Sequence, residues 1–306
     1  MLGVVAALVL ASALTVGACG GGKRQTTPAP GGKRGAGKPP VILGIRSFTE
    51  QRVLGELYAQ ALRAKGFQVT VKSHPGGPEV IDAALTSGRI DGYPEYDGLI
   101  LTAIAHDAKR QASARSTYDA AKAFEEQRGF TLLGRTPFAD VDALATTSAY
   151  ARGRQLTQVG DLMKVGRFKL GAAPEFGTRV TGLVGIERRY GISNVDFRPL
   201  SIGRQYRALD AGQIQVAGVL TTDGRLRSGR YAVLEDPQHV FGFQNVVPVF
   251  GRRVLAAEGP TFARTIDAVS AKLTIPAMRR LNAAVELDRN APADVARRFL
   301  RASGLA

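Results

Sequence analysis

The chain of 306 residues has few of the side chains from which catalytic and metal centres are built. It contains one cysteine, Cys19, and three histidines, His74, His106 and His239. None of the histidines has metal-ligand spacing to another, so we expect no metal site. The single thiol lies near the N-terminus, which excludes an internal disulfide and a catalytic Cys–His pair. Because no nucleophile–base set can be named, we expect no enzymatic activity and no cofactor.

Charge is absent from the N-terminal leader. Residues 1–18 carry no charged side chain, and the run 14–18 ends in small residues directly before Cys19. This pattern resembles the lipobox of bacterial lipoproteins, which implies that residues 1–18 are a signal peptide and that Cys19 is acylated. The mature chain would then be held by lipid on the outer face of the cytoplasmic membrane, in the cell envelope or periplasm.

Three alternatives to a lipobox stay open for the leader. An apolar run of this length is at the lower edge of what can cross a bilayer, so an uncleaved anchor, a cleaved secretory signal and a buried helix are each compatible with it. The first three residues also lack the positive charge that usually opens a signal peptide. Either the true start lies upstream or the leader is atypical.

Acidic residues are absent from the segment that follows. Residues 19–40 are rich in glycine, proline and basic side chains and have almost nothing with which to form a core, so we expect a disordered tether. This tether either attracts anionic lipid headgroups or is a solvated spacer. Its basic residues are Lys23, Arg24, Lys33, Arg34 and Lys38.

The formal net charge of +15 does not indicate a nucleic-acid partner. The arginines are scattered, and no RNP, helix-turn-helix or zinc pattern is present, so we expect no nucleic acid to bind. Residues 41–306 exceed what one small core holds and suit two α/β domains.

The start of this region has the pattern of a βαβ unit. Residues 41–45 form a short apolar run typical of a buried parallel strand. Ser47 and Glu50 fit a capping box for a helix that ends at 65–66, and residues 67–71 give a second strand. Such a unit requires a right-handed crossover and a parallel sheet.

The same alternation continues along the chain and predicts two lobes. Loops at the carboxyl ends of the strands would face a cleft between them. The pattern predicts a helix at 79–87, a strand at 89–93 that ends at Pro94, a second block with strands at 169–171, 195–198 and 213–219 and helices at 179–190 and 203–211, and final helices at 261–272, 276–284 and 292–302.

Collinear segments covering nearly all of residues 41–303 resemble one known family. They are Gly44–Gln51, Leu54–Tyr58, Gly76–Glu79, Ser87–Asp91, Tyr93–Tyr96, Thr222–Arg225, Val233–Asp236, Gln244–Pro248 and Leu281–Asn282. The chain is similar to the substrate-binding proteins of ABC importers for osmoprotectants such as glycine betaine, choline and carnitine. The resemblance implies a monomer that delivers a small zwitterionic or cationic solute to ABC permease and ATPase subunits.

The resemblance also implies an α/β fold of the type II periplasmic-binding-protein kind, in which each lobe is a mostly parallel sheet flanked by helices and the ligand cleft lies between the lobes. The expected boundaries are 41–140 and 248–306 for the first lobe and 141–247 for the second. Two hinge strands are expected, near 137–143 and 246–249.

The chemistry of a betaine sets what such a cleft must supply. Its carboxylate calls for arginine forks and helix N-termini. Its bulky cation calls for aromatic faces, each worth roughly 0.5–2 kcal/mol. By resemblance, Arg46 and Arg179 are the carboxylate-binding residues and Tyr96 is one cage tyrosine. Gly76 and Gly77 allow a tight turn, with ligand approach as a secondary role.

The remaining cage positions depart from the family pattern. Asp142, Leu220 and Gln244, which precedes Asn245, stand where betaine-binding relatives place tyrosines. Such a polar site fits a weakly held betaine or a different amine or amino-acid-like solute, because a carboxylate can replace an aromatic face beside a cation. A sensory or scaffold lipoprotein without transport is a further alternative.

Each candidate residue also has an ordinary alternative. The two arginines suit surface ion pairs, and Tyr96 suits packing at a strand end. Asp142 suits a hydrogen bond at the hinge, and Gln244 and Asn245 suit the satisfaction of crossover-strand backbone.

Overall fold

Two five-stranded sheets form the framework of the protein, seen in a computed structural model that describes residues 34–107, 109–201 and 203–306. Cys19, the leader and most of the expected tether lie outside these residues. The strands of the first sheet are β1 (Val41–Arg46), β2 (Val69–His74), β3 (Gly92–Tyr96), β4 (Phe130–Leu132) and β10 (Val246–Gly251). Those of the second are β5 (Asp142–Thr147), β6 (Phe168–Ala172), β7 (Val195–Pro199), β8 (Val216–Leu220) and β9 (Tyr231–Leu234).

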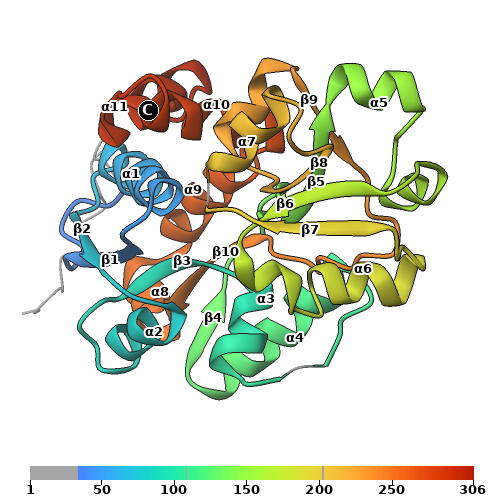
Figure 1. Cartoon of the computed structure of the whole chain (residues 1–306). Coiled ribbons are helices and arrows are strands. Elements are labelled where there is room, and N and C mark those ends of the chain that lie inside the picture. The colour runs from blue at the N-terminus through green and yellow to red at the C-terminus, as the bar shows by residue number, and fades with distance from the viewer. Residues whose placement is uncertain (1–33, 108, 202) are drawn as a thin grey trace, which may run out of the picture. The chain divides into compact units, whose positions relative to one another are not determined.

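The two sheets have matching topologies. Their strand orders are β2-β1-β3-β10-β4 and β7-β6-β8-β5-β9 (Figure 1). In each sheet four strands run in one direction, while β10 in the first and β5 in the second run antiparallel to both neighbours. The expected α/β fold with two lobes and mostly parallel sheets is therefore confirmed.

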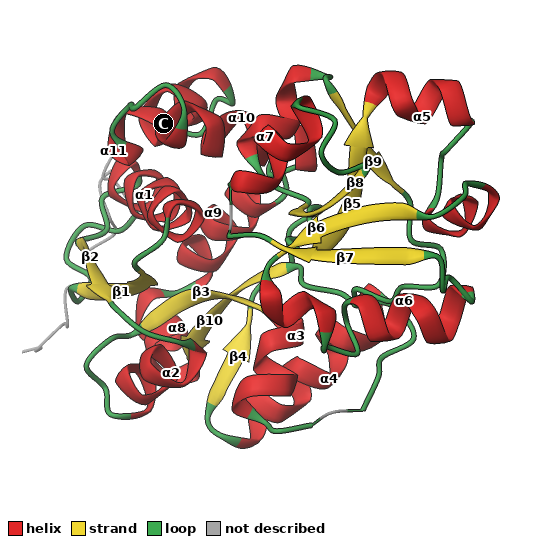
Figure 2. Cartoon of the chain, in the orientation of Figure 1, coloured by secondary structure: helices red, strands yellow, loops and turns green. Residues whose placement is uncertain are grey.

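Helices cover the sheets, as Figure 2 shows. The first lobe carries α1 (Thr49–Ala64), α2 (Pro78–Thr86), α3 (Asp97–Leu99), the π-helix η1 (Ile100–Ile104), α4 (Ala114–Gln127), α8 (Arg252–Glu258), α9 (Pro260–Ser270), α10 (Ile275–Glu286) and α11 (Pro292–Ala302). The second carries α5 (Ser148–Arg154), α6 (Leu183–Tyr190), α7 (Arg204–Asp210) and the 3-10 helices η2 (Val159–Lys164), η3 (Pro174–Gly177) and η4 (Gly224–Ser228).

Neighbouring residues of one strand pack into different hydrophobic clusters, one on each face of the sheet. Leu43 belongs to the cluster beneath α1, α9, α10 and α11, whereas Ile42 packs with α2, η1 and α4 on the other face. In β5, Leu144 packs with α6, while Ala143 and Ala145 pack with α7. Both sheets are thus buried on two faces, which is why the strands read as continuous apolar runs.

Helix α1 follows its predicted apolar face. Val53, Leu54, Leu57, Ala61 and Leu62 are all 0% exposed. The helix ends at the predicted position, where Lys65 is the C-cap and the next residue is a glycine with φ of 93°.

The predicted start of α1 is wrong in one respect. Phe48, not Ser47, is the N-cap, and it makes no side-chain capping bond. Glu50 does not reach back to the cap, because its carboxylate is buried against Tyr96 and Asn282. Tertiary contacts therefore replace the capping box.

The strand predicted to stop at Pro94 continues to Tyr96. Pro94 lies opposite Pro248 of β10. On its other side, β3 pairs with β1 only at Leu43–Gly92, two residues before Pro94. The N–H that proline lacks is therefore not needed for a hydrogen bond between β3 and β1.

Two crossover segments, 133–141 and 235–245, join the sheets and lie side by side. Ala139 forms an isolated antiparallel bridge with Asn245. The Asp140 amide donates to the Gln244 carbonyl at 3.0 Å, and the Thr136 amide donates to the Val246 carbonyl at 2.9 Å. These bonds make the two segments a short paired ribbon. The first segment overlaps the hinge strand expected near 137–143, but the second hinge strand, expected near 246–249, lies within β10 of the first sheet, and the second crossover comes earlier in the chain.

The C-terminal helices of the first lobe also touch the second lobe. Gly224 of η4 approaches α10 so closely that an added Cβ would lie 2.6 Å from the Ala283 backbone. Arg227 pairs with Asp288 at 2.9 Å. A side chain larger than hydrogen at position 224 would push the lobes apart.

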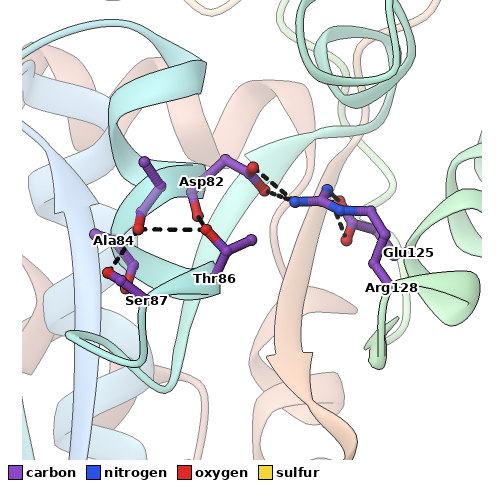
Figure 3. Close-up of polar contacts among 7 residues, drawn as sticks. Asp82, Ala84, Thr86, Ser87, Glu125 and Arg128 are labelled. Atoms are coloured by element: carbon purple, nitrogen blue, oxygen red, sulfur yellow. Dashed lines mark hydrogen bonds and ion pairs between the residues drawn. The ribbon is translucent and has the colours of Figure 1, made fainter.

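An ion cluster fastens α2 to α4 on the first lobe. Arg128, at the end of α4, donates to both oxygens of Asp82 at 2.7 and 2.6 Å and to Glu125 at 3.1 Å (Figure 3). Burial raises the pKa of Glu125 to about 7. This cluster belongs to the scaffold.

Within the described residues, no helix has both the length and the apolar character that crossing a bilayer requires.

Candidate functional site

The first half of the candidate site lies at the carboxyl edge of the first sheet. Arg46 ends β1, and Glu95 lies on the adjacent parallel strand β3, so both side chains reach the same edge. Arg46 Nη2 donates to Glu95 Oε1 at 2.8 Å, with exposed side-chain fractions of 11% and 0%. Burial raises the pKa of Glu95 to about 7, although Arg46 opposes the shift.

Two aromatic rings flank this ion pair. Phe48 and Tyr96 stack with centroids 6.5 Å apart and an interplanar angle of 16°. The guanidinium carbon of Arg46 lies 5.0 Å from the Phe48 centroid and 5.4 Å from that of Tyr96. Phe48 is 41% exposed and therefore offers aromatic surface at this edge. Phe48 was not among the predicted site residues, although a large apolar residue two positions beyond Arg46 was a signal for it.

The hydroxyl of Tyr96 points into the protein. It donates to Glu50 Oε1 at 2.8 Å, and the tyrosine is 4% exposed. Burial raises the pKa of Tyr96 well above its ordinary value. The ring is therefore held from behind by a buried acceptor.

The second half lies at the corresponding edge of the second sheet. Asp142 begins the antiparallel strand β5 and is in register with Leu220, the last residue of β8. Arg179 follows η3, which is reached from the end of β6, a parallel neighbour of β8. The topology thus gathers these three residues at one edge.

An ion pair also forms in this half, but it is more exposed. Arg179 Nη2 donates to Asp142 Oδ2 at 2.8 Å, with exposed side-chain fractions of 41% and 24%. Burial raises the pKa of Asp142, against the opposing effect of Arg179. Leu220 is 45% exposed beside them. The half is accessible and polar.

Gln244 and Asn245 bond to the backbone around the crossover segments. Gln244 Oε1 accepts from the Leu99 amide at 3.0 Å. Asn245, which is 4% exposed, donates through Nδ2 to the Thr136 and Phe138 carbonyls at 3.0 Å. Both side chains therefore satisfy backbone groups near the crossover segments, which is the alternative to a ligand-binding role. The Asn245 bonds also tie the start of β10 to the first crossover segment.

Asp97 also bonds to the backbone at the start of β10. Its buried carboxylate accepts the Asn245 amide and the Gly98 amide, both at 2.9 Å. Burial raises the pKa of Asp97 to about 7, although these backbone donors lower it. The acid was not anticipated from the sequence.

Gly76 and Gly77 shape the turn between β2 and α2. Gly76 has a φ of 128°, and an added Cβ would lie 2.8 Å from a Val80 methyl group. Gly77 is the N-cap of α2. The turn therefore requires glycine at position 76 for conformational reasons alone.

A hollow of about 760 Å³ lies beside the crossover ribbon. It is bounded by α3, η1 and the following loop of the first lobe, by α6 of the second, and by residues 238–244. Among the predicted site residues, Gln244 lines it. Its basic lining residues are Lys109, Arg110, Arg188 and Arg189.

Comparison with known proteins decides the family. The model of OpuAC, the substrate-binding domain of ABC-type glycine betaine transport systems, matches residues 39–302. The chain belongs to this family. It is 35% identical over 272 residues to a glycine-betaine-binding protein of Pseudomonas aeruginosa, covering 85% of this chain and 86% of that protein. It is 29% identical over 279 residues to the glycine betaine-binding protein YehZ of Escherichia coli, covering 87% and 91%.

Solved structures agree on the fold. A glycine betaine/carnitine/choline ABC transporter structure superposes with a TM-score of 0.81 at 24% identity, covering 87% of this chain and 99% of that one. Apo YehZ from Escherichia coli gives 0.77 at 26% identity, with the same coverage. The family is one of extracytoplasmic solute-binding proteins.

Within the described residues, no three His, Cys, Asp or Glu side chains are grouped to hold a metal.

Proposed function

We propose that the protein binds a small quaternary ammonium solute between its lobes, either a zwitterion such as glycine betaine or carnitine or the cation choline, and delivers it to an ABC permease. The observation that carries this proposal is the pair of arginines, Arg46 and Arg179, one at the carboxyl edge of each sheet. Each guanidinium has five N–H donors, and the protein carboxylates Glu95 and Asp142 each accept from one Nη2. The remaining donors suit a ligand carboxylate.

The cationic end of the solute would lie against Phe48 and Tyr96. Their stacked rings, with Phe48 partly exposed, supply the aromatic surface that a weakly hydrated cation prefers. Lobe closure would add Asp142 and Leu220 from the other side, so contacts from both lobes enter one binding equilibrium.

A second candidate is a solute whose ammonium carries hydrogens, such as an amino acid or amine. Asp142 is the observation that favours it, because its carboxylate is partly exposed at a position where the family resemblance implies a tyrosine. A carboxylate accepts hydrogen bonds from a primary or secondary ammonium, whereas a quaternary ammonium has no N–H to donate.

Titration calorimetry distinguishes these candidates. We would titrate purified protein with glycine betaine, choline, carnitine, glycine and proline under identical conditions. Saturable binding of the quaternary compounds supports the first candidate, and preference for glycine or proline supports the second. If none of the five gives saturable heat, the proposed solute class is wrong.

The anchoring of the protein is a separate part of the proposal. The proposed order is a signal peptide at 1–18, a lipidated tether at 19–40 that begins with Cys19, a first lobe from 41–140 and 248–306, and a second lobe at 141–247. A Cys19→Ser variant should fail to incorporate a labelled fatty acid and should leave the membrane fraction. Incorporation of the labelled fatty acid into the variant as into the wild type would overturn the lipid anchor at Cys19 without affecting the solute proposal.

A further inference from the structure

A buried acid, Glu50, lies where the first lobe touches the second. It is in the first turn of α1 and is 4% exposed. Both carboxylate oxygens are used: Oε1 accepts from the Tyr96 hydroxyl at 2.8 Å, and Oε2 accepts from Asn282 Nδ2 at 2.8 Å. These donors come from β3 and α10, so Glu50 joins three elements of the first lobe.

The contacts continue into the second lobe. Asn282 Nδ2 also donates to the Thr222 carbonyl at 3.1 Å, and Thr222 Oγ1 donates to Asp140 Oδ1 at 2.8 Å. Thr222 follows β8, while Asp140 lies in the first crossover segment. We call the connected residues Tyr96, Glu50, Asn282, Thr222 and Asp140 the Glu50 network. It runs from the aromatic ring of the candidate site to the contact between the lobes.

The charged groups around Glu50 do not stabilise a buried carboxylate. Among the described residues, no lysine or arginine donates to it. The facing charged groups are Asp140 from the crossover and Glu286 from α10, both acidic, while Arg46 beyond Tyr96 is committed to Glu95. A buried carboxylate in such surroundings is costly unless it is protonated. A glutamine avoids that cost and keeps both contacts if its Oε1 accepts from Asn282 Nδ2 and its Nε2 donates to the Tyr96 hydroxyl oxygen.

We propose that Glu50 is a positioning residue of the binding site, which holds the Tyr96 ring and the Thr222 turn in one hydrogen-bonded network and so couples lobe movement to placement of the ring. The inference rests on the proposed function insofar as Tyr96 faces the solute.

A dependence on pH follows from this arrangement. Burial raises the pKa of Glu50, and burial together with the charge of Glu50 raises the pKa of Asp140 well above its usual range. As pH rises, the pair loses protons, and repulsion between the two carboxylates then strains the lobe contact. Solute affinity should therefore fall as the pH rises and the pair loses its protons.

The experiment compares Glu50→Gln and Glu50→Ala with the wild type, using Glu125→Gln as the matched control. Glu125 is a buried carboxylate of the same lobe, remote from the Glu50 network. We would measure Kd for glycine betaine, or for whichever of the five solutes binds best, between pH 6 and 9. The wild type and Glu125→Gln should both lose affinity as the pH rises through this range.

The two Glu50 variants should then diverge. Glu50→Gln should retain affinity and lose it less steeply with rising pH than Glu125→Gln does, the remaining slope coming from Glu95. Glu50→Ala should bind at least about tenfold more weakly at every pH. If Glu50→Gln keeps the wild-type pH slope, or Glu50→Ala binds as well as the wild type, the inference is overturned.

Hydrogen exchange without solute separates this inference from the proposed function. Amides of residues 221–226 and of α10 should exchange faster in Glu50→Ala than in Glu125→Gln. Faster exchange combined with a wild type that binds none of the solutes would retain the lobe coupling and reject the solute class. Unchanged exchange would reject the coupling whatever binds.

Discussion

The two halves of the candidate site are built from the same pair of charges in different surroundings. Arg46 and Glu95 are 11% and 0% exposed, and aromatic rings enclose the guanidinium. Arg179 and Asp142 are 41% and 24% exposed beside the exposed Leu220. Both pairs have the same N–O distance of 2.8 Å, so the difference lies in burial and not in geometry.

Because of this difference in burial, the residues of the second half can be replaced at a smaller loss of stability than those of the first. Removing one partner of a buried pair leaves a charge in a poor solvent, whereas an exposed pair contributes about 0–1 kcal/mol. We expect the buried side chains of the first half to be held in place before the solute binds. The second half should set preference among solutes, because its residues tolerate replacement.

The largest effect should come from Arg46→Ala. This variant leaves Glu95 buried without its cation. The free energy of unfolding should fall by about 3–5 kcal/mol at pH 8, where Glu95 is charged in the wild type and must either stay charged without a partner or take up a proton in the variant. The loss should be smaller at pH 6, because Glu95 can then hold a proton. Urea unfolding at both pH values measures this.

Arg179→Ala is the matched control for that experiment. Its unfolding free energy should stay within about 1 kcal/mol of the wild type, while its affinity for a carboxylate solute falls. Equal loss of stability in the two variants would contradict the contrast between the halves.

The wild-type protein should itself lose stability as pH rises. The pKa of Glu95 is raised from 4.5 to about 7, so between these values the native state holds a proton that the unfolded state has released. The corresponding contribution is complete below pH 4.5 and is lost as pH rises through 7, by about 3 kcal/mol. Unfolding of Glu95→Gln across this range should show a shallower decline, and an unchanged slope would show that Glu95 titrates normally.

A smaller effect is expected from exchanging Asp142. Asp142→Tyr restores an aromatic face and should improve glycine betaine binding over glycine by about tenfold relative to the wild type. Asp142→Asn, which keeps the size but removes the charge, should weaken cationic solutes without that gain. Calorimetry with both solutes measures the ratio, and the same ratio in all three proteins would remove Asp142 from the site.

The sequence predicted the framework because local periodicity and burial agreed. The apolar positions of α1 are spaced for one face, and the 41–45 run is a strand buried on both faces. The pattern could not show that Pro94 lies opposite Pro248, since that depends on a strand 154 positions later in the chain (248 − 94).

The candidate site was less accessible to sequence reasoning. Ser47 and Glu50 have capping-box spacing, yet Glu50 bonds to Asn282, a residue 232 positions away. The partners of Arg46 and Arg179 are likewise distant in sequence, so their pairing with Glu95 and Asp142 required the topology. Residue type indicated the chemistry, and the sheet order determined which charges meet.

A crystal structure of the protein with its tightest-binding solute would test the central claim most directly. We predict that the solute lies between the sheet edges, with its carboxylate within hydrogen-bond distance of Arg46 or Arg179 and its cation against Phe48 and Tyr96. A solute bound elsewhere, with both arginines still paired only to Glu95 and Asp142, would contradict the account.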